Sequence, residues 1–159
     1  MSKVAIDQLR QWIGREERAS EVLTEALVSR FEATLGTSLT RIEGEAPLAI
    51  HWCLTQPAVA SDGLGVDGHP ARGGFLPPVP LPRRMWAGGE LTFVAPLRVE
   101  ETVSRVSRIV DVTHKQGRSG ELVFVTLEHE IYSASTLAIR DIQNIVYRDS
   151  DTKSAPPIP

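Results

Sequence analysis

The chain has 159 residues, a formal net charge of -3 at pH 7 and a single cysteine, Cys53. Its length suits one domain, and the weak negative charge disfavours a nucleic-acid surface, which usually carries a basic patch. One cysteine excludes an internal disulfide and a multi-cysteine zinc site, and it favours a reducing compartment, so we expect a cytoplasmic protein. The first 20 residues are too charged for a signal peptide, and no apolar run is long enough to cross a membrane.

Three apolar stretches with helical spacing come first in the chain. The first covers residues 3–13. The second begins at Ser20, a good N-cap residue, and stops before Gly36, where a glycine commonly ends a helix. The third begins at one proline and is followed closely by another, which suits a helix with a defined start and end. We therefore predict helices over residues 3–13, 20–35 and 47–55.

Residues 62–90 form a long irregular arm that holds seven of the twelve glycines and five of the eleven prolines. Connections of this length are uncommon in compact domains and are usually either functional or disordered. Disorder fits poorly, because the arm contains several large apolar residues, including Phe75, Leu76 and Trp86. We predict an ordered arm that crosses a binding surface and covers the helix at 47–55.

From Leu91 onward the apolar residues alternate, which is typical of half-buried strands. Pro96 removes one ladder donor and predicts an edge strand or a bulge, and a change of phase predicts a bulge in the second strand. A further strand is expected among residues 37–46. The four long segments with short connections favour an antiparallel meander over residues 91–99, 102–114, 122–133 and 136–148.

Helices followed by strands indicate an α+β domain whose helices cover one face of an antiparallel sheet. The end of the chain, residues 149–159, is polar and rich in proline, which predicts a flexible tail. The expected organisation is therefore a single domain over residues 1–148 followed by that tail.

This order of elements resembles the hot-dog fold, in which a long curved antiparallel sheet wraps around a central helix. The strings RRMWAGGEL and KQGRSGELVFV are similar to the N-terminal dehydratase half of MaoC-like enoyl-CoA hydratases, of the mesaconyl-CoA and itaconyl-CoA hydratase type. The resemblance covers most of residues 20–148. It implies an acyl-CoA thioester as ligand, with CoA as part of the substrate and no separate cofactor.

The chain departs from this family at the place where its catalytic units carry a D-x-N-P-x-H motif. The corresponding stretch, residues 36–46, reads GTSLTRIEGEA and contains neither Asp nor His. The resemblance thus implies a component that contacts the acyl-CoA while a second hot-dog unit supplies the Asp and His. The alternative is a non-catalytic hot-dog protein that binds acyl-CoA thioesters. In both cases we expect little or no hydration by this chain alone.

Candidate substrate-binding residues lie at the end of the arm: Arg83, Arg84, Trp86, Gly88 and Gly89. Arginine grips phosphate oxygens bidentately, an aromatic ring stacks on adenine, and glycines allow backbone to approach a narrow ligand closely. The alternative is that the arginines tie down the arm through carbonyls and carboxylates while the tryptophan packs in the core. Arg72 and Arg118 are weaker phosphate candidates.

Two histidines, His51 and His69, are weak catalytic candidates, whereas His129 is in phase with apolar neighbours and is expected to be buried and hydrogen-bonded. Cys53 is expected to be a small buried residue. No metal site is predicted, because His51 and Cys53, two apart on a helix, would point in different directions.

A proline-motif ligand for an SH3-type domain is a rival interpretation of LPPVPLPRR, but its basic residue comes one position too late. Exposed sheet edges favour pairing, so we expect a homodimer or pairing with a catalytic hot-dog unit. No nucleic-acid or membrane partner is expected.

Overall fold

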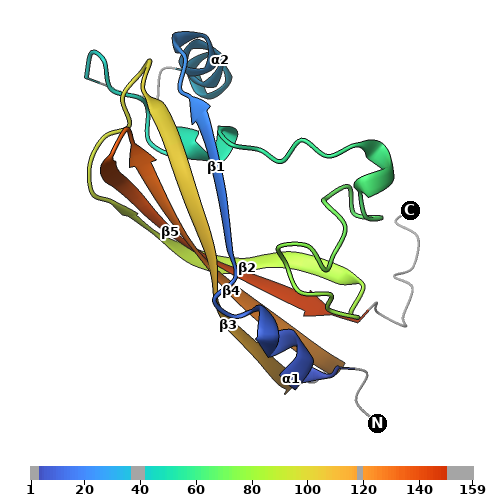
Figure 1. Ribbon diagram of the computed structural model, residues 1–159. Helices are drawn as coiled ribbons and strands as arrows, with labels where there is room; N and C mark the ends of the chain where they lie inside the picture. Colours follow the sequence, from blue (N-terminus) through green and yellow to red (C-terminus); the bar gives the residue numbers. More distant parts are fainter. Residues whose placement is uncertain (1–3, 37–41, 118–119, 150–159) are drawn as a thin grey trace, which may run out of the picture.

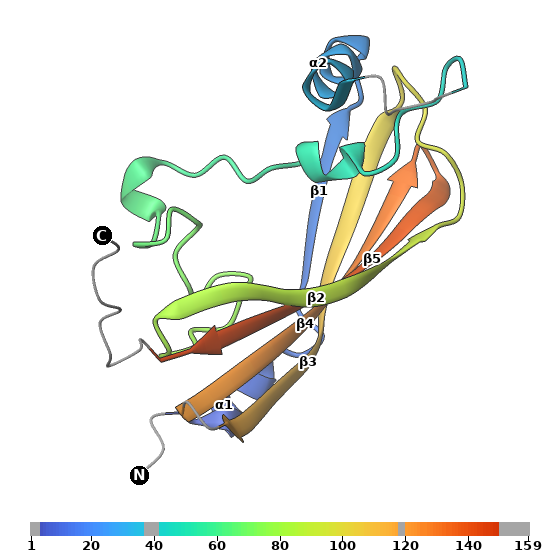
Figure 2. The ribbon, with the colours of Figure 1, turned by 180° about the vertical axis from the view of Figure 1, so that it is seen from behind.

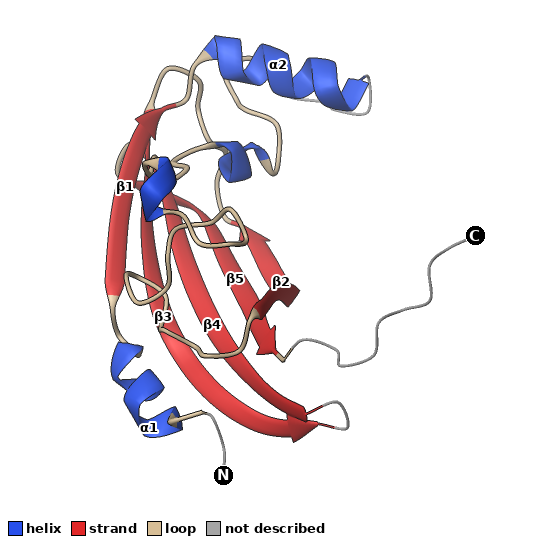
Figure 3. Cartoon of the chain, turned by 90° about the vertical axis from the view of Figure 1, so that its right-hand side faces the viewer, coloured by secondary structure: helices blue, strands red, loops and turns tan. Residues whose placement is uncertain are grey.

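The computed structural model describes residues 4–36, 42–117 and 120–149. This part of the chain forms a five-stranded antiparallel sheet with few helices (Figure 1). The spatial order is β1-β3-β4-β5-β2, which makes β1 and β2 the edge strands. Figure 3 shows that the sheet is curved and that the long connection before β2 lies on its concave side. The strands are β1 (Glu16–Val22), β2 (Arg83–Phe93), β3 (Thr102–Gly117), β4 (Gly120–Ser133) and β5 (Thr136–Arg148).

Strand β1 was not predicted, because its sequence EERASEV shows no apolar alternation and its side chains are nearly all exposed. It forms because every residue pairs with β3, from Glu16 opposite Arg108 to Val22 opposite Thr102. Opposite charges across this pair assist, since Arg108 Nε donates a 2.9 Å hydrogen bond to Glu16 Oε1. The strand is therefore a product of tertiary pairing rather than of local pattern.

Two of the predicted helices are present but shorter. The first is α1 (Ile6–Leu9), which continues as the 3₁₀ turn η1 (Arg10–Trp12). The second is α2 (Glu25–Leu35), which ends at Gly36 as predicted. Its N-cap is Thr24, whose hydroxyl accepts a 3.2 Å hydrogen bond from the Leu27 amide. The prediction of Ser20 as N-cap was wrong, because that residue lies in β1.

The predicted central helix over residues 47–55 was wrong in length. Only one 3₁₀ turn forms there, η3 (Ile50–Cys53). Ala49 has a left-handed backbone (φ 69°) and interrupts the chain before this turn, and the extended Leu54 ends it, followed by the left-handed Thr55 (φ 55°). The Thr55 amide is held by a 2.7 Å hydrogen bond to Glu21 Oε2. Proline near both ends did not make a helix, and in the described residues no long helix crosses the concave face of the sheet.

The predicted four-strand meander is correct for β3, β4 and β5 but wrong for the first strand. Strand β2 begins at Arg83, within the predicted arm, ends before Pro96, and pairs with β5. The connection from β2 therefore passes around the end of the sheet to reach β3 (Figure 2). The bulge predicted for the second strand is confirmed between Ile109 and Asp111 of β3. The strand predicted among 37–46 lies partly outside the described residues, and Glu45 makes only an isolated bridge with Arg98.

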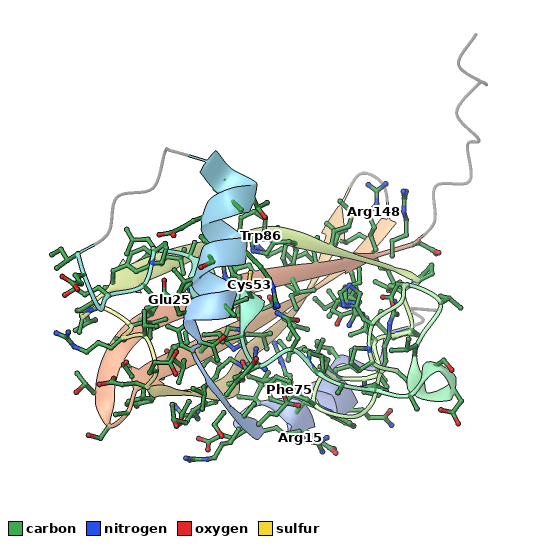
Figure 4. The ribbon with its side chains drawn as sticks, turned by 90° about the horizontal axis from the view of Figure 1, so that it is seen from above. Arg15, Glu25, Cys53, Phe75, Trp86 and Arg148 are labelled. Atoms are coloured by element: carbon green, nitrogen blue, oxygen red, sulfur yellow. The ribbon has the colours of Figure 1, made fainter. Side chains whose placement is uncertain are left out.

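The arm packs on the sheet and on the N-terminal segment rather than on η3, so its predicted position over the central helix was wrong. Phe75 and Leu76 contact an apolar cluster built around β3 and β4. Arg15 Nη1 donates a 2.6 Å hydrogen bond to the Gly74 carbonyl, and Figure 4 shows Arg15 and Phe75 close together. A 3₁₀ turn, η4 (Ser61–Gly63), lies within the arm.

The concave face carries two separate apolar clusters. The first cluster joins α1 and the arm to the second half of β3, the first half of β4 and the end of β5. It comprises Val4, Leu9, Val79, Leu81, Ile109, Val112, Val123, Val125, Leu127 and Tyr147. The second cluster joins α2 and η3 to the opposite end of the sheet, and comprises Leu23, Val28, Ala46, Ile50, Leu54, Leu97, Val103, Ile131, Ala138 and Ile139. The strip of sheet between them is polar.

Candidate functional site

A cavity of about 490 Å³ lies over this polar strip, between η3, the arm and the concave face. It exists because η3 is a single turn and leaves the middle of the sheet uncovered by helix. A smaller hollow of about 320 Å³ near the end of β2 has Glu45 as its sole charged lining residue. The chemistry of the described residues is therefore concentrated in the larger cavity.

A row of four polar residues crosses the floor of this cavity. Glu17, Ser107, His129 and Asp141 lie directly opposite one another on β1, β3, β4 and β5. Directly paired residues of neighbouring antiparallel strands share a face, so these side chains form one line across the sheet. We call this line the polar row.

His129 is buried in the polar row, and its Nδ1 lies 2.8 Å from Ser107 Oγ. The prediction of a buried, hydrogen-bonded histidine is confirmed. Burial lowers the pKa of His129, since a buried imidazolium loses its hydration. The Asp141 carboxylate opposes this shift and the Arg105 guanidinium adds to it. The neutral imidazole is therefore the favoured form.

Asp141 is the buried carboxylate of the polar row. Its Oδ2 accepts hydrogen bonds from Trp52 Nε1 at 3.0 Å and from Gln143 Nε2 at 2.9 Å. Burial would raise the pKa of this carboxyl, but the polar hydrogens of His51, Trp52 and Gln143 together hold it below its ordinary value. Asp141 is therefore an ionised group inside the cavity.

His51 comes from η3 and is only 7% exposed. Its Nε2 lies 3.6 Å from Asp141 Oδ2, just beyond hydrogen-bond distance. Among the described residues neither ring nitrogen has a hydrogen-bond partner. The structure thus brings this sequence-predicted candidate together with a carboxylate that the sequence analysis did not identify.

Arg105 is the cation nearest the polar row on β3, two residues before Ser107 on the same face of the strand. Its Nη2 lies 3.7 Å from Glu17 Oε1, a long ion pair, and its buried Nε has no hydrogen-bond partner in the described part of the chain. Arg105 therefore retains unused donor capacity toward the cavity, which it lines.

Two of the predicted substrate-binding residues, Arg84 and Trp86, line the cavity from β2. Trp86 is 69% exposed, so it does not pack in the core. Arg84 Nη2 lies 2.8 Å from Asp67 Oδ2 and forms an ion pair with it, but the two atoms are not aligned for a hydrogen bond. Burial would raise the Asp67 pKa, but the His69 amide and the Arg84 guanidinium hold it below its ordinary value. The arginine thus also ties the arm to β2.

The other three predicted residues, Arg83, Gly88 and Gly89, are not part of the cavity lining. The two glycines follow a bulge in β2 after Trp86. Gly88 has φ 148°, and a Cβ on Gly89 would meet the Ile142 carbonyl oxygen at 2.1 Å. Their local role is therefore to let β2 bend and approach β5 closely.

The remaining candidates occupy different places. His69 is exposed and lines the cavity from the arm, where its amide donates a 3.3 Å hydrogen bond to Asp67 Oδ1. Arg72 donates to the carbonyls of Val79, Leu81 and Pro82 and so holds the arm in shape. Cys53 is exposed, so its prediction as a small buried residue was wrong. Arg118 and most of the predicted tail at 149–159 lie outside the described residues.

Asp141, Ser107 and Arg105 were not predicted as site residues. A signal for Asp141 was available, because it shares its strand phase with the buried Ile139 and Tyr147. In the sequence of β3, Val106 and Arg108 are in phase with Val110 and Val112, so in a strand without a bulge they would share one face. The bulge between Ile109 and Asp111 shifts the phase of the strand. In the part of β3 before the bulge, the face turned toward the cavity therefore carries Val103, Arg105, Ser107 and Ile109.

Among the described residues, no group of three or more His, Cys, Asp or Glu side chains is placed to hold a metal ion. Across residues 4–36, 42–117 and 120–149, no helix has the length and apolar character needed to cross a membrane.

Solved structures share this fold at low sequence identity. The ChsH1-ChsH2 complex from Mycobacterium tuberculosis contains a chain with a TM-score of 0.67 and 16% identity, covering 96% of this chain and 92% of that one. The MaoC-like dehydratase from Rhodospirillum rubrum gives a TM-score of 0.52 at 15% identity, covering 87% and 93%. HtdX from M. tuberculosis gives a TM-score of 0.54 at 21% identity, covering 84% of this chain and 51% of that one. The fold is the hot-dog fold.

Sequence comparison identifies the family. Mesaconyl-C(4)-CoA hydratase from Chloroflexus aurantiacus is 39% identical over 150 residues, which are 93% of this chain and 54% of that protein. The chain thus spans about half the length of this curated relative. Residues 49–158 match the model of hydroxyacyl-thioester dehydratase type 2, Htd2. The chain belongs to the Htd2 family of hydroxyacyl-thioester dehydratases.

Proposed function

We propose that this chain is the substrate-binding hot-dog unit of a hydro-lyase that hydrates or dehydrates CoA thioesters. The acyl group is short, branched and dicarboxylic, as in mesaconyl-CoA. A second hot-dog unit, in the same assembly, supplies the catalytic Asp and His. Membership of the Htd2 family and the name of the Chloroflexus relative support the reaction class and the acyl group.

The observation that carries this proposal is the open cavity of about 490 Å³ over the middle of the sheet. Here one 3₁₀ turn, η3, leaves room for an acyl group between two apolar clusters. Ligand sites of this kind are mostly apolar with a few convergent polar groups, and this cavity has that composition.

The division of labour follows from acid–base chemistry. Hydration requires a base that activates water and an acid that protonates the α-carbon, both within hydrogen-bond reach of the substrate. Residues 36–46 carry no Asp or His, and Glu45 lies at the smaller hollow, away from the cavity. This chain therefore contributes binding and orientation, and the second unit contributes proton transfer.

For CoA itself, we propose contacts from Arg84 and Trp86, which line the cavity from β2, with Arg83 on the same strand as a further phosphate ligand. Trp86 offers an exposed ring for stacking, and Arg84 is anchored by Asp67 and so is already oriented. Gly88 and Gly89 contribute by setting the path of β2. Trp86→Ala is expected to weaken acyl-CoA binding about 5- to 100-fold if its stacking resembles that of nucleic-acid bases on aromatic rings.

The test is a thermal-shift and calorimetry panel of the purified chain with CoA, crotonyl-CoA and mesaconyl-C4-CoA. We expect stabilisation by acyl-CoA thioesters and a weaker response in Trp86→Ala. Val94→Ala is the control, because Val94 is exposed just beyond β2 and does not line the cavity. Absence of any shift with all three ligands, together with a folded protein by circular dichroism, would refute the proposed function.

A further inference from the structure

We propose that Arg105 and His51 form a carboxylate-binding subsite at the floor of the cavity, which receives the free carboxylate of a dicarboxylic acyl group. The inference rests on the proposed function, because it assumes that the cavity holds the acyl group. It adds which atoms of that group are recognised and by which side chains.

The first observation is the kind of polar atom left without a partner. Among the described residues that line the cavity, the buried side-chain atoms lacking a hydrogen bond are His51 Nδ1 and Nε2, Arg105 Nε and Arg84 Nη2. All are nitrogens, and the Arg84 atom is already ion-paired with Asp67. Buried polar groups without partners are rare in native proteins. The arginine nitrogens are donors and an imidazole ring carries at least one N–H, so the cavity lining offers unused donors to an acceptor-rich ligand.

The second observation is the capacity of Arg105. Its one ion-pair partner among the described residues is Glu17 at 3.7 Å, and that carboxylate side chain is 47% exposed. The planar guanidinium presents several donors and binds carboxylates bidentately, with more geometric specificity than lysine. A ligand carboxylate can therefore bind to Arg105 without first removing a tight internal partner.

The third observation is that Arg105 and His51 line the same cavity, on the two sides of His129. Arg105 is opposite Ile131 on β4, so His129 is its diagonal neighbour across the pair, within reach of a long side chain. His129 is directly opposite Asp141, beside which His51 lies. The His129 imidazole is affected electrostatically by both Arg105 and His51. The two side chains therefore approach the polar row from different elements, Arg105 from β3 and His51 from η3 beside Asp141.

An added carboxylate is accommodated on the Arg105 side, where the guanidinium offsets its charge, because the ionised Asp141 repels it at the other end of the polar row. Asp141 itself already accepts hydrogen bonds from Trp52 and Gln143 and needs no further donor. A hydrocarbon acyl end at the same position would leave the arginine and histidine nitrogens buried without partners. Sites built to hydrogen-bond a polar group reject analogues that lack it for this reason.

The test compares two ligands of the same shape on the full chain. Mesaconyl-C4-CoA carries a carboxylate where 3-methylcrotonyl-CoA carries a methyl group. By calorimetry we expect the wild-type chain to bind the dicarboxylic thioester about 10- to 100-fold more tightly, the range of a charge-assisted hydrogen bond. Arg105→Met, which keeps the apolar stem, should lose that preference while its affinity for 3-methylcrotonyl-CoA changes less than about threefold, since no charged hydrogen bond is lost there.

Arg108→Met is the matched control, because Arg108 is on the same strand but pairs with Glu16 on β1 and does not line the cavity. It should keep the wild-type preference. Arg105→Lys, which retains the charge, should keep part of it and replaces Arg105→Met if the latter does not fold. Equal affinity of the wild-type chain for the two ligands would overturn the subsite but leave the proposed function standing. Failure to bind either ligand would overturn both.

Discussion

The two ends of the concave face and its middle are built on opposite principles. At the ends, apolar side chains such as Ile50 of η3 and Ile109 of β3 are completely buried in the two apolar clusters. In the middle, the polar row lies under a cavity, with ring and guanidinium nitrogens that lack partners among the described residues. The ends stabilise the fold, whereas the middle forgoes apolar packing and is available to a ligand. Four predictions separate these roles.

The largest expected effect concerns turnover. The chain alone should bind acyl-CoA but hydrate mesaconyl-C4-CoA very slowly. Addition of a hot-dog chain with the D-x-N-P-x-H motif should raise the hydration rate at least about 100-fold, because a single general acid or base contributes about 10²–10⁴-fold. Loss of the double-bond absorbance measures both rates.

Several turnovers per second by the chain alone would contradict this division of labour. His51 and Asp141 would then be the candidate acid–base pair, and Asp141→Asn would be expected to abolish the activity.

At the apolar ends, Ile50→Ala and Ile109→Ala should each lower the free energy of unfolding by about 2–5 kcal/mol, because each removes a fully buried side chain and leaves a cavity. Urea denaturation followed by circular dichroism measures the change. Val66→Ala, at a fully exposed position, should stay within about 0.5 kcal/mol of the wild type. If the two core variants were as stable as Val66→Ala, the clusters would not be the source of stability.

In the polar middle, Asp141→Ala should cost about 1–3 kcal/mol, because Trp52 and Gln143 lose their acceptor in a buried site. Asp141→Asn keeps one acceptor oxygen and should cost less. Asp111→Asn, at an exposed position on β3, is the control. A loss for Asp141→Ala equal to that of Ile50→Ala would mean that the middle contributes as much to stability as the ends.

The smallest effect is a pH dependence from the polar row. The pKa of His129 is lowered in the folded chain, so between its folded value and the unfolded value of about 6.5 the unfolded state binds more protons. Stability should therefore fall as pH decreases below about 6.5, by less than about 1.4 kcal/mol per pH unit for one proton. His129→Gln should flatten that slope in urea titrations between pH 7.5 and 5.5. An unchanged slope would contradict the assignment.

Asp141 acts in a different pH range. Its pKa is also lowered, so its contribution to stability is complete above the unfolded aspartate value of about 3.9 and is lost only as pH falls below that value. The His129 and Asp141 effects are therefore separable in one titration series.

Local sequence determined the features that need only neighbouring residues. Gly36 ends α2, the change of phase marks the bulge in β3, and His129 in phase with apolar residues is buried. The alternating pattern also located β3, β4 and β5, because their side chains face the two sides of one sheet with period two. The family resemblance, based on strings spanning β2 to β4, was sufficient to predict the hot-dog fold.

Only the tertiary structure decided the features that depend on distant partners. Strand β1 has no apolar pattern and exists through its pairing with β3. The stretch around η3 has helical spacing, but the left-handed Ala49 and the bond from the Thr55 amide to Glu21 restrict it to one turn. Asp141, His129 and Ser107 are far apart in sequence and meet because strand register places them opposite one another. Register is set by the whole sheet, so the polar row and its cavity could not be predicted from local patterns.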